Sequence, residues 1–113
     1  MRININGYFV SEGMPWEDWQ SGHKFEGVNY DFLFFRKDGK FFMHSAKQKE
    51  INIEVFKDKK NYGEYKMNDN TIEVLYNPNS QFPVEIIFTI LSSETLLDKN
   101  LIEYHYVEVD KVF

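Results

Sequence analysis

The sequence predicts an all-β fold: an antiparallel up-and-down meander of about 8–9 strands that closes into a barrel, with one short helix near residues 14–20. Three observations support this prediction. Short runs alternate apolar and polar residues, turn signals separate these runs, and aromatic residues make up 18% of the chain. Closing the meander removes its unpaired strand edges. At 113 residues we expect a single domain, residues 1–113, in which large rings supply the burial that a cysteine-free chain needs.

The N-terminal part of the chain predicts one strand followed by the helix. The strand covers residues 3–10, and the alternation breaks after it. Pro15 suits the first turn of a helix, and Gly22 suits its end. One helical turn would place Trp16 and Trp19 on the same side, because they are three residues apart. We expect these rings either to plug one end of the barrel or to form a lid over a ligand.

The segment 25–47 predicts an aromatic hairpin with a two-residue turn at Asp38-Gly39. This register would place Leu33, Phe35 and Phe42 on one face. The opposite face is also apolar and would carry Phe32, Phe34, Phe41 and Met43. Because a barrel strand normally keeps one face wet, the first three residues are predicted to support a homodimer or the binding of a protein partner.

Two shorter segments predict half-buried strands. Residues 51–55 alternate apolar and polar side chains, which indicates a strand with one wet face. Residues 63–76 predict a hairpin that turns at Asp69-Asn70. A two-residue turn there pairs Tyr65 with Val74 on an apolar face and leaves the opposite face charged.

The C-terminal strands continue the meander. Residues 84–90 present one apolar face, and two predicted turns after them would place Leu97 opposite both Ile90 and Ile102. Taken together, the registers predict a common interior. Its members are Ile51, Ile53, Val55, Tyr65, Met67, Ile72, Val74, Ile86, Phe88, Ile90, Leu97 and Ile102.

Charge and motif content exclude several functions. The net charge is −5 and the basic residues are scattered, so nucleic-acid binding is not expected. His23, His44 and His105 lie far apart and cysteine is absent, so we expect no metal site. The familiar hydrolase, P-loop and dinucleotide motifs are missing, so we expect no catalytic residues and no cofactor. No apolar run could span a membrane or act as a secretory signal, which favours a cytoplasmic location.

Three short motifs mark the order of the meander. They are Asn6-Gly7-Tyr8-Phe9 near the start, Phe32 and Phe34 followed by residues 37–41, and Gly63-x-Tyr65 leading to Ile72-x-Val74. With these motifs the chain resembles the lipocalin-like, or calycin-type, small β-barrels. The resemblance implies a barrel of about eight strands, just wide enough to enclose one small ligand.

We therefore expect a non-enzymatic barrel that binds a small apolar or amphipathic ligand, with tyrosine hydroxyls orienting it in an apolar cavity. The candidate ligand-binding residues are Trp16, Trp19, Phe34, Met43, Tyr65, Tyr76, Phe88 and Tyr104. The tyrosines have a structural alternative, in which they fill the core and their hydroxyls reach one end of the barrel or a buried water.

The competing hypothesis is an acidic protein-interaction module of the immunity-protein or inhibitor type. Such a module would present an aromatic hairpin and a negative surface to a basic partner. The content of the barrel interior distinguishes ligand binding from protein interaction. Packed rings would favour the interaction module, and a void larger than roughly 300 Å³ would favour ligand binding.

Overall fold

The protein is described by a computed structural model that covers residues 3–57 and 59–109. Over these residues it contains nine strands and one short 3-10 helix, η1. Their bounds are β1 (Gly7–Ser11), β2 (Met14–Gln20), β3 (His23–Phe35), β4 (Lys40–Ala46), η1 (Ile53–Phe56), β5 (Gly63–Asn68), β6 (Thr71–Tyr76), β7 (Val84–Ser92), β8 (Thr95–Leu97) and β9 (Glu103–Glu108).

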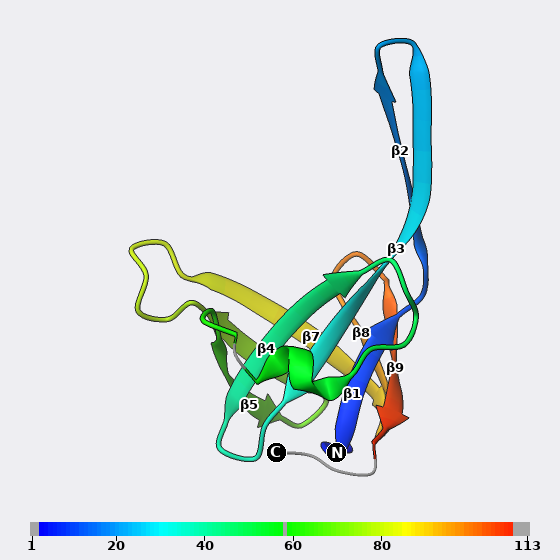
Figure 1. Cartoon of the computed structure of the whole chain (residues 1–113). Helices are drawn as coiled ribbons and strands as arrows, with labels where there is room; N and C mark the ends of the chain where they lie inside the picture. Colours follow the sequence, from blue (N-terminus) through cyan, green and yellow to red (C-terminus); the bar gives the residue numbers. More distant parts are fainter. Residues whose placement is uncertain (1–2, 58, 110–113) are drawn as a thin grey trace.

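The strands form an antiparallel meander that closes on itself (Figure 1). Neighbouring strands follow the order β1-β9-β8-β7-β6-β5-β4-β3-β2, and an additional pairing of β1 with β3 closes the barrel and leaves β2 outside it. At this seam Phe9 pairs with Leu33, and the N–H of Asp31 donates to Ser11 Oγ at 2.9 Å. The predicted all-β meander barrel is confirmed.

The predicted helix near residues 14–20 is wrong. These residues form β2, which pairs with the first half of β3 from Met14 opposite Asn29 to Gln20 opposite His23. The turn between them is Ser21-Gly22, whose φ angles of 51° and 77° fit a two-residue hairpin. Gly22 therefore closes a turn rather than a helix, because pairing along β3 overrides the local helix signals.

The β3–β4 hairpin differs from its predicted register by one residue. Its loop holds three residues, 37–39, because the N–H of Arg36 donates to the carbonyl of Lys40 at 2.8 Å. Gly39 adopts a φ of 89°, as this loop type requires at its last position. Phe35 consequently pairs with Phe41, and Phe34 pairs with Phe42.

This register divides the apolar side chains into two clusters. The inner cluster fills the barrel and contains Leu33, Phe35 and Phe41. The outer cluster lies on the other face of β3 and β4 and contains Phe32, Phe34 and Phe42. Since both clusters are covered by the chain itself, the proposal that Leu33, Phe35 and Phe42 form an exposed partner surface is wrong; their exposed fractions are 0%, 1% and 5%.

The cover over the outer cluster is the segment that was predicted to be a strand at residues 51–55. It forms a loop ending in η1, where the side chain of Asn52 accepts the N–H of Glu54 at 3.0 Å. Ile53 and Phe56 are buried against the outer cluster, and the rings of Phe56 and Phe34 stack with centroids 5.1 Å apart. Ile51 and Val55 are partly buried against the same cluster, so the prediction that Ile51, Ile53 and Val55 face the barrel interior is wrong.

The interior elsewhere is close to the prediction. Tyr65 pairs with Val74 as expected, and Ile72, Val74, Phe88 and Ile90 belong to the inner cluster. Leu97 does not, because a register shift between Ile90 and Ser92 turns Leu96 inward in its place. Met67, near the end of its hairpin, is 36% exposed.

Replacing Phe88 by Ala should lower the free energy of unfolding by about 3–5 kcal/mol, because its ring is fully buried against other rings. Urea denaturation measures this loss. The control is Ile87→Ala on the same strand, where the side chain is 45% exposed and the expected loss is about 1 kcal/mol or less. Equal losses for the two variants would contradict the assigned orientation of β7.

Candidate functional site

The barrel interior is occupied by aromatic rings. Phe35 lies 5.0 Å from Phe41 and 6.3 Å from Phe88, measured between ring centroids, and Phe9 lies 5.9 Å from Phe35. Tyr65 adds a fifth ring at 5.1 Å from Phe35. These are the spacings of packed edge-to-face and tilted pairs, so the rings themselves fill the centre of the barrel.

A cavity of about 260 Å³ opens at the mouth of the barrel. It brings together three of the predicted site residues, Met43, Phe88 and Tyr104. Its other lining residues are Val84, Glu85, Ile86, Ile87, Asp98, Lys99 and Asn100. The floor is therefore apolar and aromatic, and the rim supplied by the β8–β9 loop is polar.

Asp98 holds this rim in place. Its Oδ1 accepts the N–H groups of Asn100 at 2.8 Å and Ile102 at 3.0 Å, and its Oδ2 accepts the hydroxyl of Tyr104 at 3.1 Å. Burial, together with the neighbouring Asp98 carboxylate, raises the pKa of Tyr104 above the ordinary range for tyrosine. The Tyr104 hydroxyl is thus a neutral group that anchors the loop at the edge of the cavity.

The remaining predicted residues lie elsewhere. Tyr65 donates its hydroxyl to the carbonyl of Arg36 at 2.5 Å, beside the β3–β4 loop. Tyr76 packs edge-to-face on Phe41 with centroids 6.2 Å apart. Phe34 belongs to the outer cluster, and Trp16 and Trp19 lie on β2 outside the barrel, so neither a plug nor a lid is formed.

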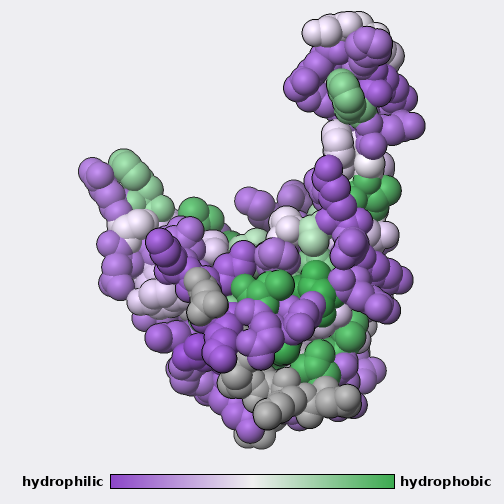
Figure 2. Space-filling model, viewed as in Figure 1, coloured by the Kyte–Doolittle hydropathy of each residue, from purple (hydrophilic) through white to green (hydrophobic). Residues whose placement is uncertain are grey.

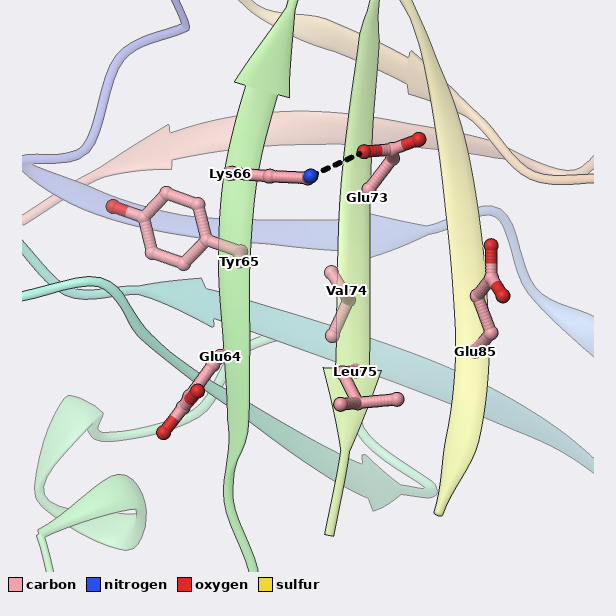
Figure 3. Close-up of a pocket in the computed structure, with 7 residues that line it drawn as sticks. All are labelled: Glu64, Tyr65, Lys66, Glu73, Val74, Leu75 and Glu85. Atoms are coloured by element: carbon pink, nitrogen blue, oxygen red, sulfur yellow. Dashed lines mark ion pairs between the residues drawn. The ribbon is translucent and has the colours of Figure 1, made fainter. Parts of the chain in front are cut away.

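A second hollow, of about 440 Å³, lies along the wall made by β5, β6 and β7 (Figure 3). Figure 3 shows Lys66 and Glu73 facing each other across two strands, and their charged atoms are 3.5 Å apart. Glu64 and Glu85 extend from the flanking strands on either side of Leu75. This wall has the mixed charges of a solvated sheet face.

The most distinctive feature of the surface is a two-stranded ribbon that projects from the barrel (Figure 1). We call this ribbon, residues 14–29, the arm. In Figure 2 the arm projects away from the body, and the outline of the molecule between them is concave. The surface of the arm is mostly hydrophilic, with isolated hydrophobic residues. An open hollow of about 590 Å³ lies along it, lined by Pro15, Trp16, Glu17, Glu26, Gly27 and Val28.

The two faces of the arm follow from its register. One face carries Trp16 opposite Gly27, and Phe25 two residues further along β3. The Trp16 ring lies against the bare backbone of Gly27, where a Cβ would come within 2.9 Å of the indole, and Lys47 Nζ lies 5.3 Å from the ring centroid. The Trp16 N–H meets no acceptor among the described residues.

The other face of the arm combines charge with an exposed indole. Lys24 Nζ lies 2.9 Å from Glu17 and 3.4 Å from Glu26, which face each other across the two strands. Trp19 sits opposite Lys24 and is 65% exposed. Phe25 on the opposite face is 50% exposed. The arm was not predicted from the sequence, although the predicted aromatic strand was longer than its neighbours and could have indicated a projecting hairpin.

No group of three or more His, Asp or Glu side chains in the described parts of the chain could hold a metal ion. Over the same residues, no helix has the length and apolar character needed to cross a membrane. A scan against protein-family models found no match, and searches of curated proteins and of solved structures found none either. The barrel is compatible with the lipocalin-like resemblance, but these comparisons assign the chain to no family.

The raised pKa of Tyr104 predicts a loss of stability in alkali. The unfolded phenol ionises near pH 10, while the folded phenol stays neutral to higher pH, so its contribution is complete below about pH 10 and declines above it. Tyr104→Phe should reduce the slope of the unfolding free energy against pH in this range, measured by urea denaturation. An unchanged slope would contradict the prediction.

Proposed function

We propose that the protein is a non-enzymatic protein-interaction module and that the arm is its contact element. The observation that carries this proposal is the exposure of large aromatic side chains on a ribbon that no other described element covers: Trp19 is 65% exposed and Phe25 is 50% exposed. Aromatic residues, Phe included, are enriched at protein–protein interfaces, and Trp is prominent among the residues that dominate binding energy. The arm presents both.

The physical weakness of an isolated ribbon supports the same conclusion. A two-stranded hairpin is marginally stable in water unless a further strand or another layer packs on it. Among the described residues, the charged contacts that support the arm are the contact of Lys47 with the Trp16 ring and the exposed ion pairs of Lys24 with Glu17 and Glu26. Exposed ion pairs contribute roughly 0–1 kcal/mol, so the arm has much to gain from a partner.

The barrel interior is less suited to binding a ligand. Its centre is filled by rings, and the cavity at its mouth, at about 260 Å³, is smaller than the roughly 300–1,000 Å³ of typical ligand pockets. A filled barrel can instead serve as a rigid base from which the arm extends.

Photo-crosslinking tests the arm as the contact element. A photoreactive residue at Phe25 should give more protein adducts, in cells that express the protein, than the same residue at Leu75. Leu75 is a matched control because it is 41% exposed on the barrel wall. Equal adduct yields at the two positions would contradict the proposal.

A small amphipathic ligand at the barrel mouth is a second candidate function. The supporting observation is that Met43, Phe88 and Tyr104 converge on one cavity whose rim carries Lys99 and Asn100. A ligand with an apolar chain against the cavity floor and an anionic head group near Lys99 would fit this arrangement of apolar and polar residues.

Decanoate and decanol are suitable probes for this second candidate. Decanoate at about 100 times its dissociation constant should stabilise the fold by about 2.7 kcal/mol and raise the melting temperature by several degrees. Decanol should stabilise less, because it lacks the charge that would pair with Lys99. Asn100→Trp, which narrows the mouth, should abolish the decanoate shift, and an unchanged shift in that variant would contradict binding at the mouth.

A further inference from the structure

We propose that the partner of the arm is a second copy of this chain, which pairs edge to edge with β3. The inference rests on the proposed function and names its partner. Two arms would form a four-stranded antiparallel sheet in the order β2-β3-β3-β2. Three features of β3 favour this pairing: its open edge, the direction of its backbone groups and the order of three residues along it.

The open edge of β3 begins where β4 ends. The last residue of β4, Ala46, pairs with Tyr30, so residues 23–29 have β2 on one side and no described strand on the other. Lys24, Phe25, Glu26 and Val28 are exposed. The two edges of the arm differ, since Pro15 lies on the outer edge of β2 and blunts it, whereas the open edge of β3 contains no proline.

The direction of the backbone groups follows from the ladder. Gln20 and His23 flank the two-residue turn and form its hydrogen-bonded pair, so odd-numbered residues of the arm's β3 segment point their N–H and C=O groups at β2. The bond from the Arg36 N–H to the Lys40 carbonyl agrees, because it shows an even-numbered residue facing the β4 side. Lys24, Glu26 and Val28 therefore present their backbone groups at the open edge.

The sequence along this edge is complementary to itself. An antiparallel pairing centred on Phe25 places the two Phe25 rings opposite each other in a non-hydrogen-bonded pair, where side chains approach most closely. The same register places Lys24 of each copy opposite Glu26 of the other, in hydrogen-bonded pairs. Two symmetric opposite-charge pairs and one aromatic pair result from three consecutive residues.

The overall charge of −5 does not oppose this arrangement strongly. Antiparallel pairing puts the two barrels at opposite ends of the joined arms. From Tyr30 of one copy to Tyr30 of the other, ten residues of strand span about 34 Å. This separation is more than three times the screening length of about 10 Å at 0.1 M salt, so repulsion between the barrels is weak.

Charge exchange tests the pairing and its register. Glu26→Lys should weaken self-association by roughly tenfold or more in sedimentation velocity, because Lys24 would then face a lysine of the second copy twice. The arm of this variant keeps its fold, since the new ammonium group would lie opposite Glu17 within the same copy. Glu17→Lys is the matched control: it makes the same charge change on the same face, away from the open edge, and should leave association unchanged.

Mixing the two single variants gives the sharpest result. Lys24→Glu alone should also associate weakly. An equimolar mixture of Lys24→Glu and Glu26→Lys should form a heterodimer about as tight as the wild-type dimer, because both cross-copy pairs are again opposite in charge. Failure of the mixture to associate, or an equal loss in Glu17→Lys, would overturn the proposed register.

The outcomes also separate this inference from the proposed function. A wild-type protein that stays monomeric at its highest soluble concentration would overturn pairing with a second copy. If Phe25 then crosslinked a different protein, the proposed function would stand with another partner. If Phe25 also crosslinked no more than Leu75, both proposals would fall.

Discussion

The pairing of β3 with three other strands is the constraint on which the rest of the structure depends. Its 13 residues pair with β2 in the first half and with β1 and β4 in the second half. The second half closes the barrel at the β1 seam. The first half extends beyond the body, so a single strand both completes the barrel and supports the arm.

The same strand supplies both apolar clusters. Leu33 and Phe35 face the interior, and Phe32 and Phe34 face the loop that carries η1. A strand that is apolar on both faces needs cover on both faces. Here the barrel provides one cover and the segment after β4 provides the other, which explains how a chain of 113 residues buries so many rings without disulfides.

The sequence predicted the meander and the β5–β6 register because period-two alternation and a two-residue turn determine which side chains share a face. The β3–β4 register was predicted wrongly by one residue, because Asp38-Gly39 fits both a two-residue and a three-residue loop. The inward position of Leu96 was not predicted, because no residue pattern in the sequence marks the register shift between Ile90 and Ser92. Met43, Phe88 and Tyr104, three of the predicted site residues, line one cavity. The positions of Trp16 and Trp19 were not predicted, because they depend on long-range pairing with β3 and the local sequence has helix signals instead.

The proposed pairing of two arms depends on the open edge of β3 docking against a second copy. Residue-resolved amide hydrogen exchange, measured over a range of protein concentrations, tests this docking. We expect the amides of Lys24 and Glu26 to become slower to exchange as concentration rises, while those of Phe25 and Gly27, already directed at β2, change little. Exchange at Lys24 and Glu26 that does not vary with concentration would contradict this pairing.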